Sequence, residues 1–322
     1  MNSVICTLFE NHFHKGLVAL INSLHANGYK GDIYVGYLGS LPEWAKINEN
    51  SMFEKQAIET FVVNESIRIQ FIPLKTDHHL TNYKPDFMKW VLSGPAGDAE
   101  NIFYFDPDIV IDYNWNFFEE WAGFGVAVCE DVNSPLSLNH PRRMAWHKYF
   151  NGLDIPLKFD QTAYANGGFV GLNRKDYSFI SSWIMIQEHI APVIGGLQNA
   201  FIPGKNRLLG ALRERYFAFN KTDQDALNIT IGTWDGVVSF TGQEAMAFKP
   251  GSELMFHALG NPKPWSMKFL RKALKGFRPR RVDKLYWKSV SYPIKLYSNG
   301  YLFWKILTLN IASVIGRFYG KY

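Results

Sequence analysis

Two aspartates at the end of an apolar run are the first residues of this sequence that could do chemistry. Asp106 and Asp108, separated by Pro107, directly follow "NIFYF". A proline favours an extended conformation in the residue before it, and in an extended chain positions 106 and 108 point to the same side. Paired carboxylates repel each other unless a positive charge lies between them, and a hard divalent cation suits that place. The pair predicts a metal site, with a turn capped by Asp at the strand end as the alternative.

Three further stretches carry side chains suited to ligand recognition. "HALGNPKPW", residues 257–265, contains an imidazole, a glycine, a lysine and a Pro-Trp pair within nine residues. "ANGG" at residues 165–168 and "TDQDALN" at residues 222–228 offer the amide and carboxylate groups that recognise hydroxyls. Each has a plainer interpretation, namely a core histidine, a solvated lysine, and acids favoured by the dipole at a helix start.

Together, the four stretches resemble the motifs of metal-dependent nucleotide-sugar glycosyltransferases of the GT-A fold. The retaining family 8, which includes glycogenin and the bacterial lipopolysaccharide galactosyltransferases, is the most similar. Its D-x-D motif matches Asp106 and Asp108, and its H-x-x-G-x-x-K-P-W motif matches every fixed position from His257 to Trp265. Its N-[AS]-G and D-Q-D-x-L-N motifs match residues 166–168 and 223–228, although Gly167 stands where members usually carry Ala or Ser. The resemblance covers residues 4–265 in outline.

This resemblance implies a UDP-sugar or similar nucleotide-sugar donor and a metal ion. Asp106, Asp108 and His257 would bind the ion, with Asp106 also contacting the donor. One nitrogen among oxygens suits Mn²⁺ better than Ca²⁺, with Mg²⁺ as the alternative ion. Lys263 would bind the donor phosphates, and Gly260 would let the backbone approach them closely.

The same resemblance implies residues for the sugar and for catalysis. Asn166, Gly167 and Gly168 would lie against the donor sugar, together with the start of the "TDQD" stretch. Asp223, Gln224 and Asp225 are the catalytic candidates, with no role chosen between nucleophile and stabiliser. Two more donor contacts are implied at Thr7, toward the base or ribose, and at Lys89, toward the phosphate or sugar. For Lys89 an exposed helix lysine is the alternative.

An α/β fold is predicted to position these residues. Apolar runs at residues 3–9, 32–39 and 66–74 predict strands, and residues 14–28 and 43–62 between them predict helices. This opening favours a Rossmann-like, mostly parallel central sheet with helices on both faces, as in the GT-A fold. Ligands of such sheets bind at the carboxyl ends of the strands. The long stretches at residues 132–152 and 195–216 are predicted to form the acceptor wall or a lid.

The charge of the chain divides it into an acidic body and a basic tail. Residues 266–322 carry thirteen Lys or Arg and one acid, a net charge of +12, so the overall +5 leaves residues 1–265 at −7. We expect a catalytic domain at residues 1–265 and a helical C-terminal segment at residues 266–322. The segment contains twelve aromatic residues, which favours peripheral attachment to an anionic membrane surface over a transmembrane span. Helices packed back on the domain are the alternative, and no nucleic acid is expected.

Cellular location follows from weaker signals. The two cysteines, Cys6 and Cys129, lie in separate apolar stretches and suggest no disulfide framework. The first twenty residues show no basic leader followed by an apolar run. We therefore expect a cytoplasmic protein, peripheral on the cytosolic face of a membrane.

The predicted function is transfer of a sugar from a nucleotide-diphosphate donor to a glycan or lipid-linked saccharide, with retention, as in polysaccharide or lipopolysaccharide biosynthesis. An inverting enzyme of the same fold, with an aspartate as general base, is the first alternative. A protein that binds nucleotide sugars without turnover is the second. An accidental metal motif beside a nucleic-acid-binding tail is the third.

Overall fold

A nine-stranded sheet forms the centre of the molecule. The structure, a computed structural model, describes residues 2–200 and 218–318, so residues 201–216 of the stretch at 195–216, predicted as an acceptor wall or lid, lie outside it. Within the described chain the strand order is β10-β8-β9-β6-β1-β2-β5-β4-β3, and only β9 and β4 run opposite to the other strands. The strands are β1 (Ser3–Glu10), β2 (Gly31–Leu38), β3 (Glu49–Phe53), β4 (Gln56–Val62), β5 (Ile67–Pro73), β6 (Asn101–Phe105), β8 (Val126–Cys129), β9 (Phe169–Asn173) and β10 (Val238–Thr241).

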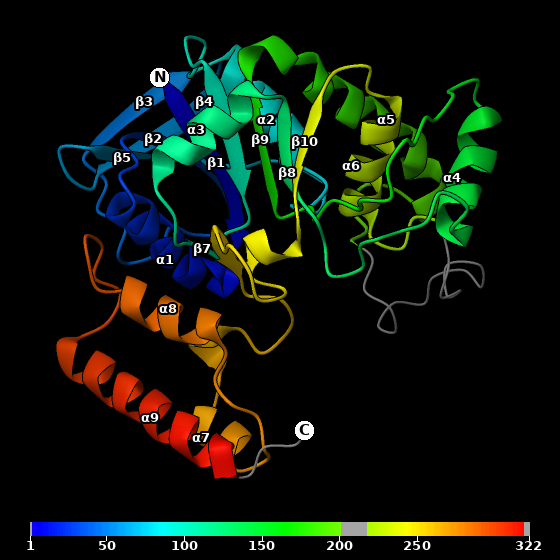
Figure 1. The fold of residues 1–322 in the computed structure, drawn as a ribbon. Helices are drawn as coiled ribbons and strands as arrows, with labels where there is room; N and C mark the ends of the chain where they lie inside the picture. The colour runs from blue at the N-terminus through cyan, green and yellow to red at the C-terminus, as the bar shows by residue number, and fades with distance from the viewer. Residues whose placement is uncertain (1, 201–217, 319–322) are drawn as a thin grey trace.

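Helices cover both faces of this sheet, as the sequence predicts (Figure 1). Alternate residues of β1 enter two separate apolar cores, Ile5 and Phe9 on one face and Cys6 and Leu8 on the other. The first core contains residues of α1 (His14–Ala26), α3 (Trp115–Gly123), α7 (Phe269–Ala273), α8 (Arg281–Ser289) and α9 (Asn299–Phe318). The second contains residues of α2 (Lys84–Ser93), α4 (Pro141–Asn151), α5 (Ser178–Ile194) and α6 (Thr222–Thr233). The mostly parallel α/β sheet with helices on both faces is confirmed.

One predicted helix is wrong. Residues 43–62 contain the hairpin of β3 and β4, which extends the sheet beyond β5. In β4 the buried Ile58 and Thr60 alternate with more exposed neighbours, the two-residue period of a strand. The turn uses Glu54 and Lys55 with φ of 46° and 67°, whereas such hairpin turns usually contain Asn or Gly. Without that turn signal, the mixture of polar and apolar residues favours a helix.

A second, two-stranded sheet brings distant parts of the chain together. β7 (Ile109–Ile111) pairs antiparallel with β11 (Met255–His257), and His257 lies opposite Ile109. The amide of Ala258 continues this pairing by donating to the carbonyl of Asp108, 3.1 Å away. This small sheet therefore places His257, the first residue of the predicted motif at 257–265, beside the predicted aspartate pair.

The C-terminal helices pack against the sheet domain. α8 contacts α1, and α9 contacts both α7 and α8. In Figure 1, α1, α8 and α9 therefore lie one below the other beneath the sheet. The buried Asn22 of α1 donates to the carbonyls of Ser289 and Ile294, 2.7 and 2.8 Å away, and accepts from the amide of Ile294. Among the described residues, no helix combines the length and apolar character needed to cross a bilayer.

Candidate functional site

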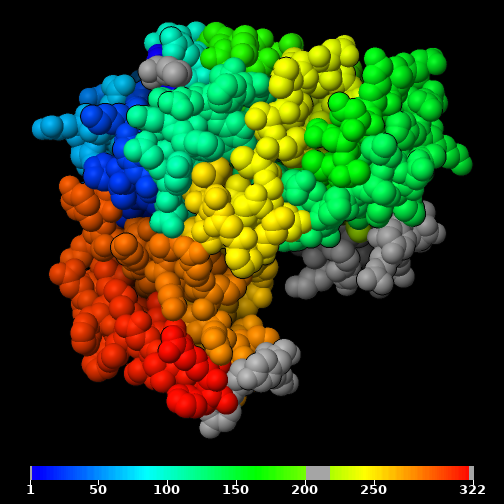
Figure 2. Space-filling view, in the orientation of Figure 1, coloured from blue at the N-terminus to red at the C-terminus, as the bar shows by residue number. Residues whose placement is uncertain are grey.

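A cavity of about 440 Å³ lies at the carboxyl ends of the strands, where the sequence places the site. It opens between the ends of β1 and β6, where the strand order reverses. β2 pairs with one edge of β1, and β6 pairs with the other edge of β1. This reversal is the usual ligand site of open α/β sheets. Figure 2 shows the molecule hollowed below the yellow residues, beside the orange part of the C-terminal segment. The polar residues that line the cavity are Glu10, His79, Thr81, Asp106, Asp108, Asp131, Asn166, Lys221, Thr222, Asp223, Gln224, His257 and Lys263.

Asp106, Asp108 and His257 form the cluster that the sequence predicts. One ligand atom from each can be chosen so that all lie within 4.8 Å of one another. Nε2 of His257 is 3.3 Å from Asp108 Oδ1 and 3.8 Å from Asp106 Oδ2. The predicted extension of the chain through Pro107 is wrong, because residues 107 and 108 form a turn closed by the amide of Ile109 and the carbonyl of Asp106. The turn, rather than an extended strand, brings the two carboxylates together.

The donor set of this cluster fits a divalent cation. Two carboxylates and one imidazole are ligands that Mn²⁺ accepts. Among the described residues, the cavity wall carries five carboxylates and two lysines. The buried Lys84 behind the wall adds a third ammonium in contact with Asp106 and Asp223, which leaves a surplus of two negative charges with neutral histidines. One divalent ion balances that surplus. Burial alone would raise the pKa of the Asp108 carboxyl, but the neighbouring His257 and Lys263 hold that pKa below its ordinary value.

Two lysines hold the aspartates of the cluster. Lys263 donates to Asp108 and, at 2.8 Å, to the carbonyl of Ala258. Lys84 is almost fully buried and lies 3.0 Å from both Asp106 Oδ1 and Asp223 Oδ2. Burial would lower the pKa of the Lys84 ammonium, but the two carboxylates raise it above its ordinary value. Lys84 therefore remains charged and links the aspartate pair to the start of α6.

Gly168 packs directly against the metal cluster. A Cβ at this position would lie 2.6 Å from Cε1 of His257, 2.9 Å from Oδ1 of Asn166 and 3.0 Å from Oδ2 of Asp106. The amide of Asp106 also donates to the Gly168 carbonyl, 2.8 Å away. No side chain fits between these groups, which explains glycine at this position in physical terms.

The opposite wall carries a network of amide and carboxylate groups. Asn166 donates to Oδ2 of Asp131 at 2.6 Å, and Lys221 lies 3.2 Å from Oδ1 of the same carboxylate. Oε1 of Gln224 accepts from the amide of Gly167 at 3.2 Å, whereas Nε2 of Gln224 is buried with no partner among the described residues. Gln224 therefore retains a hydrogen-bond donor for a ligand in the cavity.

Asp225 lies outside this wall, unlike Asp223 and Gln224. It is fully buried behind the cavity, where it accepts from the Tyr164 hydroxyl at 2.6 Å and from the Lys221 amide at 2.8 Å. Burial raises the pKa of Asp225 to about 6, although Arg142 opposes this shift. Its hydrogen bonds link the start of α6 to Tyr164, outside the cavity wall.

The three remaining predicted donor contacts, Thr7, Gly260 and Lys89, do not line the cavity. Thr7 is buried inside β1, three residues before the strand ends, and its hydroxyl has no partner among the described residues. Gly260 has φ of +76° and open space around its Cα, but only its neighbour Leu259 lines the cavity. Lys89 is exposed on α2 and does not line the cavity. Lys84, five residues earlier on the same helix, does not line the cavity either, but it contacts Asp106 and Asp223.

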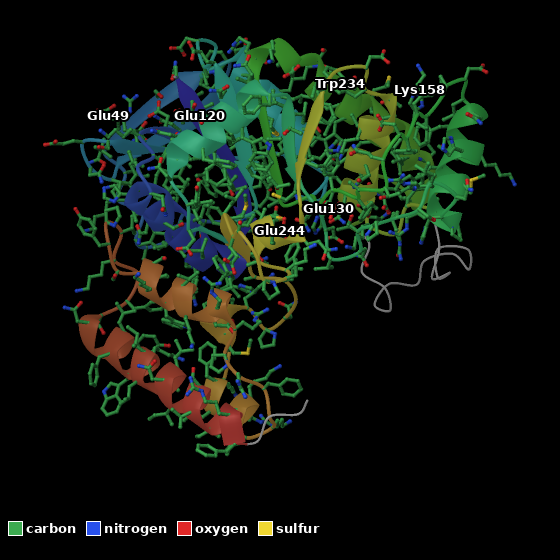
Figure 3. All side chains as sticks on the ribbon, in the orientation of Figure 1. Glu49, Glu120, Glu130, Lys158, Trp234 and Glu244 are labelled. Carbon is green, nitrogen blue, oxygen red and sulfur yellow. The ribbon has the colours of Figure 1, made fainter. Side chains whose placement is uncertain are left out.

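Sequence reasoning missed Lys84, Asp131 and Lys221. Asp131 was read only as the end of a strand, and Lys84 is adjacent to a proline at a helix start, where a lysine has no distinctive pattern. Not every acid at this edge belongs to the site. Glu130 and Glu244, labelled in Figure 3, lie near the carboxyl ends of the strands, but neither lines the cavity, and Glu244 pairs with Lys249 at 3.5 Å.

Solved structures of glycosyltransferases have a similar fold. The apo structure of the bifunctional glycosyltransferase WbbM is 11% identical, with a TM-score of 0.50 over 95% of this chain and 52% of its own. GlyE from Streptococcus pneumoniae TIGR4 is 12% identical, with a TM-score of 0.49 over 96% of this chain and 63% of its own. The galactosyltransferase LgtC, solved with donor and acceptor sugar analogs, is 14% identical, with a TM-score of 0.45 over 82% of this chain and 90% of its own. No protein-family model and no curated protein sequence matches the chain.

This chain spans about half the length of WbbM. The likeness to WbbM extends over nearly all of the present chain and shows a shared fold. The GT-A type of fold expected from the sequence motifs is therefore confirmed.

Proposed function

We propose that this protein is a metal-dependent glycosyltransferase that moves a sugar from a UDP-sugar to a glycan or lipid-linked saccharide. The observation that carries the proposal is the convergence of Asp106, Asp108 and His257, with Lys263 beside them, in the cavity at the strand ends. Chemistry of this kind needs a cation site for a diphosphate next to groups that recognise hydroxyls, and this cavity contains both.

The residues of the cavity divide the work in the proposed reaction. Asp106, Asp108 and His257 would hold Mn²⁺, which supplies Lewis-acid stabilisation to a departing diphosphate. Lys263 adds a cation at the same place and offers its ammonium to the phosphate oxygens. Asn166, Asp131 and Gln224 bind and orient the hydroxyls of the donor sugar through directional hydrogen bonds.

Retention of configuration is the proposed stereochemical outcome. An inverting enzyme needs a carboxylate that removes the proton from the acceptor hydroxyl. Two carboxylates of the cavity wall, Asp131 and Asp223, are poor candidates for that base, because Asp131 is paired with Lys221 and Asp223 with Lys84. In the retaining reaction the amide oxygen of Gln224, which has a second lone pair beside the one that accepts from the Gly167 amide, would stabilise the positive charge that develops on the sugar. The acceptor hydroxyl would enter on the side of the leaving group and pass its proton to the departing diphosphate.

The test is turnover of UDP-sugars in the presence of Mn²⁺. We expect hydrolysis or transfer from at least one donor of a panel, with loss of at least about 100-fold in the Asp108→Asn and His257→Ala variants because the metal site is broken. The matched control is Glu244→Gln, an acid at the same edge that does not line the cavity. Proton NMR of the first product from an α-linked donor should show an α-linkage, and a β-linkage would contradict retention.

The same assay distinguishes the proposed enzyme from a protein that binds nucleotide sugars without catalysis. That alternative predicts Mn²⁺-dependent UDP binding with no turnover of any donor. Absence of Mn²⁺-dependent UDP binding would contradict both the proposed enzyme and the non-catalytic binding protein.

We further propose that the C-terminal segment holds the protein on an anionic membrane surface on the cytoplasmic side, close to a lipid-linked acceptor. α9 has two apolar faces: one is packed in the core through Leu302, Leu309 and Ala312. The other is exposed and follows helical spacing through Phe303, Trp304, Ile311, Val314 and Phe318. The same segment carries exposed basic residues before α7, in α7 and in the loops after α7 and α8, namely Lys268, Arg271, Lys275 and Lys295. This combination suits an anionic bilayer interface.

A further inference from the structure

A second cavity, of about 170 Å³, lies between the loop that follows β11 and the residues around α7 and the start of α8. It shares only Leu259 with the cavity at the strand ends, so it lies outside the site described above. Its charged lining residues are Lys272, Arg278, Arg280 and Asp283. Three cations and one carboxylate leave this cavity with a surplus of two positive charges, the opposite of the surplus in the first cavity.

Only one of these three cations is neutralised by the protein. The guanidinium of Arg280 donates to both oxygens of the buried Asp283, at 3.2 and 3.0 Å. Lys272 and Arg278 have no carboxylate partner among the residues that the structure describes. Nζ of Lys272 lies 5.4 Å from the centre of the Phe277 ring, a contact that leaves its three N–H donors free for a ligand. Two unpaired cations in one cavity indicate an anion site.

Contact with α9 holds Arg278 in place. Its Nε donates to the carbonyl of Gly316, 3.1 Å away. The two segments pack so closely that a Cβ at Gly316 would lie 2.8 Å from Cγ of Arg278. The plainer interpretation is an arginine that only satisfies a carbonyl near a helix end. That contact uses Nε alone, however, and the two terminal nitrogens of the guanidinium have no partner within the described chain.

We infer that this cavity binds the phosphate group of a phosphate ester. A guanidinium binds phosphate through two parallel hydrogen bonds, and the ammonium of Lys272 adds a third donor. The surplus of two positive charges balances a doubly charged phosphate monoester. The volume suffices for such a group, since one water needs about 30 Å³. This site goes beyond the proposed function, because neither the sugar transfer nor the exposed face of α9 uses Lys272 or Arg278.

The phosphate ester has two possible sources, an anionic lipid and a soluble metabolite. The ring of Phe277, which is 55% exposed, and the half-buried Met267 also line the cavity and offer apolar surface beside the cations. An acyl chain attached to the phosphate would cover that surface, whereas a small soluble ester would leave it in water. Comparison of two esters with the same phosphate group therefore distinguishes the sources.

The experiment measures binding of glycerol 3-phosphate and of dihexanoyl phosphatidic acid, below its micelle concentration, by calorimetry without added metal. The double variant Lys272→Gln with Arg278→Gln should bind both at least about 10-fold more weakly, because it loses hydrogen bonds between charged groups. The control is Arg271→Gln with Lys275→Gln, which removes the same charge from exposed residues that do not line the cavity. This control should bind both esters as the wild type does.

Two further variants keep every charge and test the geometry of the site. Arg278→Lys cannot form the two parallel bonds and should lose about 10-fold in affinity. Gly316→Ala should also weaken binding, because its Cβ displaces Arg278. Gly300→Ala on the same helix is the matched control, since nothing lies within 4 Å of its added Cβ. A diffuse basic surface would respond to charge alone and would bind the esters equally in all three variants.

The outcomes separate the sources from failure of the inference. Phosphatidic acid bound at least about 10-fold more tightly than glycerol 3-phosphate would assign the site to a lipid headgroup, and equal affinities would assign it to a soluble ester. Equal losses in the two double variants, acetate bound as tightly as glycerol 3-phosphate, or no binding of either ester would overturn the inference. Mn²⁺-dependent UDP binding, measured in parallel, reports on the proposed function independently.

Discussion

The ammonium nitrogen of Lys84 lies 3.0 Å from Oδ1 of Asp106, inside the protein at the start of α2. The same nitrogen contacts Asp223 and the carbonyl of Gly167, and it lies 5.1 Å from the centre of the Tyr104 ring. Lys84 thus contacts three parts of the site: the proposed metal cluster, the residues just before β9 and the first turn of α6. A single buried charge connects the metal side of the cavity to its sugar side.

Replacement of Lys84 by Met should therefore reduce both stability and metal binding. The loss leaves Asp106 and Asp223 without their shared cation, and removal of one partner of a fully buried pair costs about 3–5 kcal/mol. Because both carboxylates are about one-fifth exposed, solvent lowers this cost, and we expect about 2–3 kcal/mol by urea unfolding. Lys89→Met on the exposed side of the same helix is the control and should change stability by less than about 0.5 kcal/mol. Equal losses of stability in Lys84→Met and Lys89→Met would contradict this role of the buried ammonium.

Gly168→Ala should damage the metal site while the fold survives. Its Cβ would meet His257, Asn166 and Asp106 at 3.0 Å or less, so the ligands must move apart. Displaced ligands typically lower metal affinity by about 10–100-fold, which a Mn²⁺ titration followed by electron paramagnetic resonance can measure. Gly123→Ala is the control, because nothing lies within 4 Å of its added Cβ. Unchanged Mn²⁺ affinity in Gly168→Ala would show that this cluster does not hold the ion.

The raised pKa of Asp225 should make the stability of the protein depend on pH. Its pKa is about 6 in the folded protein against an ordinary 3.8, so the folded state binds the proton more tightly. The free energy of unfolding should then fall as the pH rises from about 4 to above 6. Asp225→Asn removes this titration and should gain stability relative to wild type on the order of 3 kcal/mol between pH 4 and pH 7.5. The residues facing the carboxyl, Arg142, Tyr164 and Lys221, remain in place.

Urea unfolding at several pH values checks this prediction. Asp235→Asn, an exposed site, should show the wild-type pH profile. Parallel profiles for wild type and Asp225→Asn would contradict the raised pKa.

Much of the site could be predicted because its residues occur in short, ordered motifs. Asp106 and Asp108 were predicted as a metal pair from residue types and spacing, and the family resemblance added His257. The pairing of β7 with β11 brings the three together. The strands and most helices follow from apolar periodicity, because each buried face repeats at the spacing of its element.

What the sequence missed depends on contacts between distant segments. The hairpin of β3 and β4, within residues 43–62, is stabilised by pairing of β4 with β5, and its Glu-Lys turn gives no local signal. Lys84 and Asp131 gain their importance from partners 22 to 139 residues away, so no local pattern distinguishes them from surface lysines and strand-end acids. The sequence prediction named Lys89 alone on this helix, because its spacing to Asp106 does not specify which face of α2 is buried.

The proposed membrane attachment makes the last prediction. Phe303 and Trp304 are 62% and 65% exposed on the outer face of α9, and their removal should leave the packed face intact. The variant Phe303→Ser with Trp304→Ser should therefore melt within a few degrees of wild type but bind anionic vesicles more weakly, because it loses the apolar area that enters the interface. Co-sedimentation with vesicles of phosphatidylglycerol and phosphatidylcholine measures this. The control is Phe124→Ser, equally exposed but far along the chain from the basic segment. Binding should also weaken with added salt, since about 1 kcal/mol per basic residue near the surface is electrostatic. Equal sedimentation of the double variant and wild type, or equal loss in Phe124→Ser, would contradict attachment through this face of α9.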